Sequence, residues 1–307
     1  LRQAQRSGEL LNDPEVVNRA VSNAIEGDRE ATAEVERILA GLDLRPPDSP
    51  YERSISKTLI RASRLATEQY LTGKFDLRFD GSIRGLPAYS DTFHIYTQVA
   101  SIKGPDTVNA EKLIMVDDPD GPHNGLLVGS KRLRNLITGY AGRAQVIRWS
   151  YPVYWGFVLT APSHHLLVLR GTQRGHEWLQ TLRARQVVTA EVPEFDFPGS
   201  IHHGFATIYA RLSKPVIQAA RKLDPTRPLF VAGHSLGSPL ATLAALDIAT
   251  KIPALQPYLR LYSYAGPRLG DPTFAEAFSR IIPNSYRIVN QSDLVPTLPP
   301  TRTGQIT

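Results

Sequence analysis

The second half of the chain alternates short apolar runs with segments of helical periodicity. Leu229–Ala232 is a continuous apolar run, as expected of a strand buried on both faces, and Leu240–Ile248 follows with helical spacing. The same alternation predicts a strand at Leu259–Ala265, a helix around Phe274–Phe278 and a strand at Tyr286–Asn290. Strands that alternate with helices form a mostly parallel sheet, so we predict an α/β fold here.

The middle of the chain gives a weaker pattern. Gly156–Leu159 and Leu166–Leu169 flank a Pro-containing turn and predict a strand hairpin. Residues 74–150 mix turn signals with short apolar runs such as Leu113–Val116. The acidic turn that follows, Asp117–Gly121, does not match a calcium loop, because an apolar residue occupies the first ligand position. We therefore predict no metal site.

The first 73 residues are predicted to be helical. Asp13-Pro14-Glu15 is a helix start signal, Arg45–Pro50 is an extended break, and a further helix is expected over about Tyr51–Leu71 with Gly73 as its C-cap. We predict two units: a helical N-terminal extension over 1–73 and an α/β domain over 74–307. The extension is interpreted as a structural cap on the main domain, or alternatively as an arm that contacts a membrane or a partner.

Composition and charge narrow the partners. The 307 residues include no cysteine, which excludes disulfides and a thiol nucleophile, and the net charge is +6. This charge indicates a solvated basic surface, with attraction to anionic lipid as the alternative; the basic residues are scattered, so nucleic acid is not predicted. No apolar run is long enough to span a bilayer. The chain starts at Leu1 without a signal-peptide core, so we expect that an N-terminal piece has been removed.

Gly233-His234-Ser235-Leu236-Gly237 is a G-x-S-x-G motif between a predicted strand and a predicted helix. In this context the serine lies on a strained turn that exposes its hydroxyl as a nucleophile. The alternative is a turn serine that caps a helix. We predict that Ser235 is the nucleophile of a serine hydrolase and that the neighbouring His234 is structural.

Such a nucleophile needs two N–H donors for the oxyanion and a carboxylate later in the chain. Leu236 follows the serine, and Thr172 follows the strand Leu166–Leu169, so their backbone N–H groups are the predicted donors. Asp293 comes just after a predicted strand and is the predicted triad acid. Of its competitors, Asp247 is interpreted as a solvent-facing helix charge and Asp271 as a turn or N-cap residue.

Taken together, these segments resemble the class 3 lipase family, the fungal-type triacylglycerol lipases with an α/β-hydrolase fold. The matching pieces are Leu169–Thr172, Ile201–Phe205, Gly233–Gly237, Tyr264–Gly270 and Arg287–Pro296. The resemblance implies that Ser235 is the nucleophile, that Asp293 is the acid, that Thr172 and Leu236 form the oxyanion hole and that His202 is structural. Ser238 and Pro239 depart from the small Gly-Ala pair usual in the family.

The family carries a lid between the oxyanion loop and the segment equivalent to Gly204. Here Gln173–Ser200 places Trp178, Leu179 and Leu182 on one face of a predicted helix. Such a lid would cover an apolar acyl cleft in water and expose it at a lipid surface. The alternative is an ordinary surface helix packed on the core.

The triad histidine is missing from the sequence. In this fold it follows the acid, and none of the eight histidines follows Asp293. We expect that the chain is truncated and that the base lies beyond Thr307. The alternatives are that His176 in the predicted lid substitutes for it, or that the chain is a non-catalytic relative.

The sequence therefore predicts a carboxylic ester hydrolase that acts on lipid esters through an acyl-enzyme on Ser235, with no metal or organic cofactor. Its predicted partner is the lipid substrate, with peripheral contact to a lipid surface, and a secreted or membrane-peripheral location is favoured. The alternative function is a catalytically silent protein that binds lipid or a partner.

Overall fold

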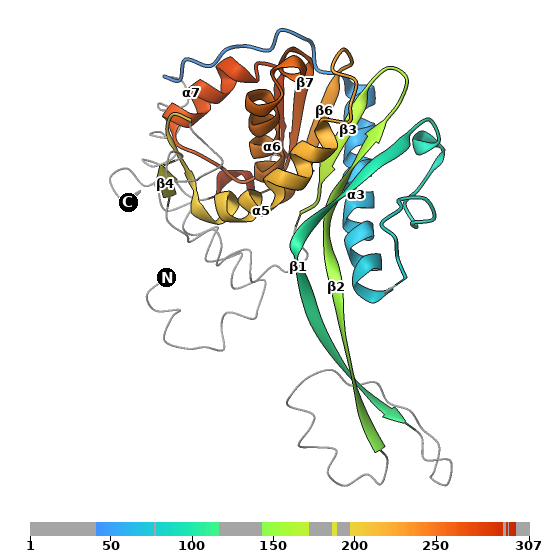
Figure 1. Cartoon of the computed structure of the whole chain (residues 1–307). Helices are drawn as coiled ribbons and strands as arrows, with labels where there is room; N and C mark the ends of the chain where they lie inside the picture. Colours follow the sequence, from blue (N-terminus) through green and yellow to red (C-terminus); the bar gives the residue numbers. More distant parts are fainter. Residues whose placement is uncertain are drawn as a thin grey trace, which may run out of the picture.

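A six-stranded sheet organises the fold (Figure 1). The computed structural model describes residues 41–76, 78–116, 143–171, 186–188, 197–290, 293 and 295–298, with only the backbone described for 106–116, 143–150, 186–188 and 297. In spatial order the strands are β1 (Thr97–Val116), β2 (Arg143–Thr160), β3 (His165–Leu169), β6 (Leu229–His234), β7 (Leu259–Tyr264) and β8 (Ser285–Ile288). The strands from β3 to β8 run parallel, while β2 is antiparallel to both of its neighbours. The predictions of a mostly parallel sheet and of a β2–β3 hairpin are confirmed.

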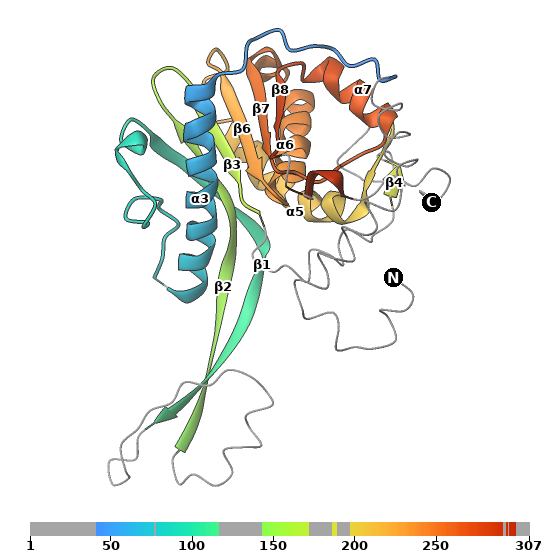
Figure 2. The same cartoon turned by 180° about the vertical axis from the view of Figure 1, so that it is seen from behind.

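Helices cover both faces of this sheet. One face carries α5 (His203–Ala220), α6 (Gly237–Lys251) and α7 (Pro272–Ile281), and the other carries α3 (Arg53–Phe75) (Figure 2). Helix α6 is apolar around most of its circumference because it is buried among β6, β7 and α5. The remaining elements are β4 (Gln186–Val188) paired with β5 (Ser200–His202), and the 3₁₀ helices η2 (Asp91–Phe93), η5 (Pro253–Tyr258) and η6 (Val295–Thr297).

Helix α3 ends later in the chain than predicted. The helix continues through Gly73 to Phe75, and Asp76 is the C-cap. Gly73 is required by packing instead, since a Cβ atom there would lie 2.5 Å from the Tyr154 ring. Leu59, Ala62, Leu65 and Ala66 of α3 are fully buried against the sheet. The division of the chain at residue 73 stays a prediction, and the helices predicted before residue 41 lie outside the described residues.

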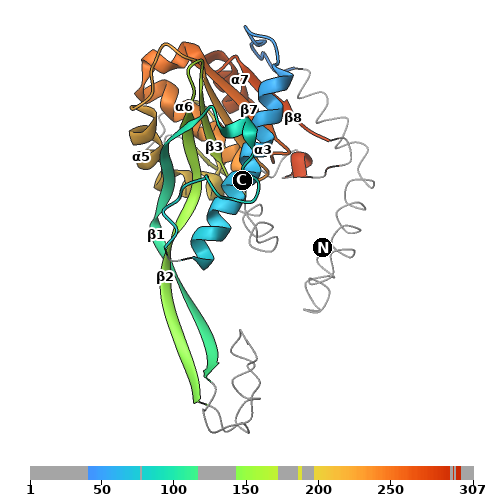
Figure 3. The ribbon, with the colours of Figure 1, turned by 90° about the vertical axis from the view of Figure 1, so that its right-hand side faces the viewer.

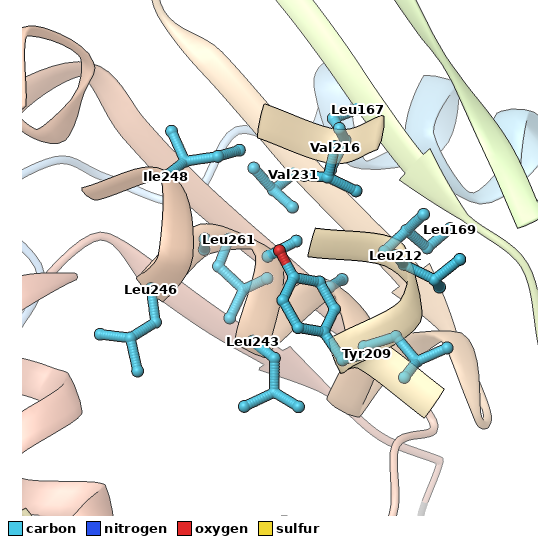
Figure 4. Close-up of a cluster of buried hydrophobic side chains, with 14 of the residues drawn as sticks. Leu167, Leu169, Tyr209, Leu212, Val216, Val231, Leu243, Leu246, Ile248 and Leu261 are labelled. Atoms are coloured by element: carbon cyan, nitrogen blue, oxygen red, sulfur yellow. The ribbon is translucent and has the colours of Figure 1, made fainter. Parts of the chain in front are cut away.

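The interpretation of Asp247 as a solvent-facing charge is wrong. Asp247 is 2% exposed and lies between α6 and α5. Its carboxylate accepts hydrogen bonds from the Tyr209 hydroxyl (2.9 Å) and the Ser213 hydroxyl (2.7 Å), and it pairs with Lys251 (2.7 Å). Figure 4 shows the Tyr209 hydroxyl among leucine and valine side chains of this core. The two hydroxyl bonds connect α6 to α5, and all three contacts offset part of the carboxylate's loss of hydration.

Strands β1 and β2 continue as a ribbon well past the last residue of β3. Gly156 of β2 pairs with Leu169, whereas β1 and β2 still pair at Val116 and Arg143. The ribbon therefore projects from the body (Figures 1 and 3). The predicted run Leu113–Val116 is the end of β1, and the predicted turn at 117–121 lies outside the described residues. Within the described ranges, no helix has the length and apolarity needed to cross a membrane.

Candidate active site

The candidate site lies where the parallel strands β3, β6 and β7 end. Ser235 directly follows β6 and has a φ of 54°, a left-handed conformation that costs a non-glycine residue roughly 1–2 kcal/mol. Its N–H donates to the carbonyl of Tyr264 (2.9 Å), and its own carbonyl accepts from the Ser238 N–H (2.9 Å). These bonds hold Ser235 on a tight, strained turn between β6 and α6, the arrangement that exposes a nucleophile.

The two glycines of the motif are required by close backbone contacts. A Cβ atom on Gly233 would lie 2.0 Å from the carbonyl oxygen of Gly237. A Cβ atom on Gly237 would lie 2.4 Å from the carbonyl oxygen of Leu169, at the end of β3. The motif therefore lets the turn fold back on itself and also lets the end of β3 press against it.

Two backbone segments lie next to Ser235. Leu236 is the N-cap of α6, where backbone N–H groups lack intrahelical partners and the helix dipole favours negative charge. Gly171, after β3, lies against the turn, since a Cβ atom on it would be 2.8 Å from the His234 carbonyl oxygen. Thr172, the other predicted oxyanion donor, lies outside the described residues.

Asp293 is partly buried in the segment that follows β8. Its N–H donates to the Asn290 carbonyl (3.0 Å), and its Oδ1 accepts from the Val295 N–H (3.0 Å). Burial lowers the pKa of His234, and the negative charge of Asp293 opposes this shift, so Asp293 lies within electrostatic reach of the residue next to Ser235.

The competing carboxylate Asp271 has a different role. It is the N-cap of α7, and its carboxylate accepts from the N–H groups of Phe274 (2.8 Å) and Ser200 (2.9 Å). The interpretation of Asp271 as an N-cap residue is therefore confirmed. With Asp247 buried between helices, neither competitor is available as the acid.

Three other described histidines have roles or positions apart from the serine turn. His202 is buried as the N-cap of α5, and its Nδ1 accepts from the Gly204 N–H (3.2 Å). His164 and His165 lie at the opposite end of the sheet, where β3 begins. His176 and most of the predicted lid lie outside the described residues.

Sequence reasoning treated Ser238 as a departure from the family and did not single out Arg170. The Ser238 hydroxyl forms a buried hydrogen bond with that of Ser263 on β7, and Gly266 leaves room for the Ser238 side chain. Arg170 is only 5% exposed at the end of β3. A charged residue directly after a buried apolar strand was the available signal for it.

Comparison with known proteins gives the family. The family model described as "Lipase (class 3)" matches residues 166–303, which contain most of β3, Ser235 and Asp293. Residues 166–303 belong to the class 3 lipase family. Among relatives of this class 3 lipase segment, the lipase of Rhizopus niveus is 36% identical over 108 residues, which cover 34% of this chain and 28% of that protein. The secreted mono- and diacylglycerol lipase of Malassezia globosa is 34% identical over 191 residues, 60% of each chain.

The fold of the class 3 lipase domain matches solved structures. The Rhizomucor miehei lipase in complex with its propeptide has a TM-score of 0.53 at 21% identity, with 85% of this chain and 70% of that chain covered. At this identity the likeness shows the α/β-hydrolase fold. The curated relatives named above are matched over only 28% and 60% of their own lengths.

Proposed function

We propose that the protein hydrolyses carboxylic esters of lipids through an acyl-enzyme on Ser235. The observation that carries this proposal is the left-handed Ser235, at φ 54°, on a turn between β6 and the N-terminus of α6. Backbone strain of this kind at a partly exposed serine is typical of functional sites.

In the proposed reaction the Ser235 Oγ attacks the ester carbonyl and loses its proton to a base. The oxyanion that forms accepts hydrogen bonds from the N–H groups of Leu236 and Thr172. The alcohol then leaves with a proton from the base, and water hydrolyses the acyl-enzyme to release the acid and restore the Ser235 hydroxyl. Asp293 is the proposed triad acid, which would orient that base.

The base itself is proposed to lie beyond Thr307. This is supported by the order of the triad in the fold, in which the histidine follows the acid. His176 remains the alternative base.

A lipid ester is the proposed substrate class because both relatives named above are lipases, one of them acting by name on mono- and diacylglycerols. The second relative is a secreted lipase by name, which also supports secretion as the proposed location. Peripheral contact with a lipid surface is proposed from the net charge of +6 together with the predicted apolar lid face.

The test is labelling with a fluorophosphonate combined with hydrolysis of short- and long-chain p-nitrophenyl esters, on the 307-residue chain and on the full gene product. We expect one label per molecule on Ser235, absent in Ser235→Ala, and hydrolysis that is orders of magnitude faster in the product that supplies the base. A full gene product that neither labels nor hydrolyses would leave the silent lipid-binding protein as the better reading.

A further inference from the structure

Arg170 is a buried cation at the edge of the candidate site. It is 5% exposed, and its guanidinium donates to two backbone carbonyls: Nε donates to Tyr154 (2.7 Å) and Nη1 donates to Gly171 (2.8 Å). The guanidinium carbon also lies over two aromatic rings, 3.8 Å from the ring centroid of Tyr70 and 4.4 Å from that of Trp155. Among the described residues, no carboxylate forms an ion pair with it.

Such a charge is costly to bury. Loss of hydration lowers the pKa of Arg170 to about 10, even though the nearby tyrosines act in the opposite direction. An apolar side chain of similar length would fill the same space between the two rings without this cost. The guanidinium is therefore retained for what its hydrogen bonds do.

The bond to Gly171 acts on the peptide group that leads to Thr172. The carbonyl of Gly171 and the N–H of the next residue belong to one planar unit, and in a trans peptide they point in opposite directions. A donor that fixes the carbonyl therefore also fixes the direction of that N–H. A charged donor additionally polarises the peptide and makes its N–H a stronger hydrogen-bond donor.

The rest of the environment keeps this peptide next to the nucleophile. The Arg170 N–H donates to the Trp155 carbonyl (2.9 Å), which ties the end of β3 to β2. On the other side, Gly171 is pressed against the turn at His234, with no room for a Cβ atom. Tyr70 brings α3 into the same arrangement, so a helix about 100 residues earlier in the chain supports the loop.

We propose that Arg170 is a positioning residue that aims and polarises the Gly171–Thr172 peptide as an oxyanion donor. The inference rests on the proposed function and adds a residue to it. Arg170 acts through the peptide and does not touch the substrate.

The experiment compares Arg170→Met with Arg260→Met in the full gene product, using a soluble short-chain ester. Arg260 is the matched control because its guanidinium lies over Phe230 (6.0 Å) and donates to Ser49 (3.1 Å) at the opposite end of the sheet. Loss of one oxyanion donor costs about 10²–10³ in kcat, so a misaimed donor should cost about 10–100-fold. We expect this loss in Arg170→Met with KM changed less than about 2-fold, and no change in kcat for Arg260→Met.

A purely structural role is separated by expressing kcat per fluorophosphonate-labelled site, which corrects for misfolded molecules. Arg170→Lys keeps the charge on a stem without the planar fork and should remain impaired. Arg170→Ala leaves a gap between two aromatic rings, and millimolar guanidinium should restore part of its kcat.

Unchanged kcat per labelled site in Arg170→Met, or an equal loss in Arg260→Met, overturns the proposal while leaving the proposed function intact. A parent protein without labelling or hydrolysis overturns both.

Discussion

The two ends of strands β3 and β6 are built in different ways. At the carboxyl ends, backbone groups dominate: Gly233 and Gly237 have no room for a Cβ atom, and Ser235 is left-handed. At the amino ends, hydrogen bonds made by side chains dominate. His164 bonds the hydroxyls of Tyr96 (2.7 Å) and Ser163 (2.8 Å).

His165 completes the amino-end network through Thr160 (2.9 Å) and the Asp224 carbonyl (3.1 Å). In the described part of the chain, the two non-glycine residues with positive φ are Ser235 and Ala265, and both follow the carboxyl ends of adjacent strands. The positive-φ strain thus lies at the candidate site, while both ring nitrogens of His164 and of His165 have hydrogen-bond partners at the opposite end.

The largest expected loss of stability comes from Gly233→Ala, at the carboxyl ends of the strands. Its Cβ atom would overlap the Gly237 carbonyl oxygen, which is backbone and cannot move aside, so we expect a loss of about 3 kcal/mol or more in the free energy of unfolding. Gly85→Ala is the matched control. Gly85 has a φ of +86° but open space around it, so only the conformational cost of about 1 kcal/mol is expected. Urea denaturation measures both, and equal losses would contradict the steric explanation.

The next effect is a pH dependence of stability. Burial lowers the pKa of His164 and of His165 in the folded protein, so the unfolded chain binds protons more readily below its own pKa of 6.5. The free energy of unfolding should therefore fall as the pH is lowered from 7 to 5, by at most about 1.4 kcal/mol per pH unit for each group. His234 at the candidate site shifts in the same direction and contributes as well.

Urea titrations at several pH values separate the two ends. His164→Gln should reduce the slope of the free energy of unfolding against pH, by at most the amount that corresponds to one bound proton. His234→Gln measures the contribution of the carboxyl end of the strands. A slope unchanged in both variants would show that these imidazoles titrate alike in the folded and unfolded chains.

The smallest effect concerns the strain at Ser235. Ser235→Gly and Ser235→Ala both remove the hydroxyl, but only glycine adopts a φ of 54° without a steric penalty. We expect the glycine variant to be more stable by about 1 kcal/mol. At Ser163, which is not among the positive-φ residues, the order should reverse because glycine gains more entropy on unfolding. Thermal melts of the Gly and Ala variants at both positions measure this difference. If the same substitution were the more stable at both positions, backbone strain at Ser235 would not explain the result.

The local sequence pattern was enough to predict those parts of the fold that depend only on neighbouring residues. The continuous apolar run at Leu229–Ala232, the glycines that flank Ser235 and the Asp-Pro start of α7 each carry their meaning within a few residues. The order of strands and helices followed from these segments, and so did the position of Ser235 on its turn.

Residues whose role depends on distant partners could not be predicted in the same way. Asp247 was interpreted as a surface charge because its own helix does not show that Tyr209 and Ser213 on α5 face it. Gly73 looked like a helix end because the Tyr154 ring that excludes a Cβ atom comes 81 positions later.

The sequence by itself determined that this chain carries a strand, a strained serine turn and a helix, because hydrophobic periodicity and glycine placement act over neighbouring residues. Only the tertiary structure decided that Arg170 is a buried cation between Tyr70 and Trp155 and that its Nη1 donates to the Gly171 carbonyl. Burial and hydrogen bonding of a charge depend on which segments the sheet brings together, and a linear pattern does not contain that information.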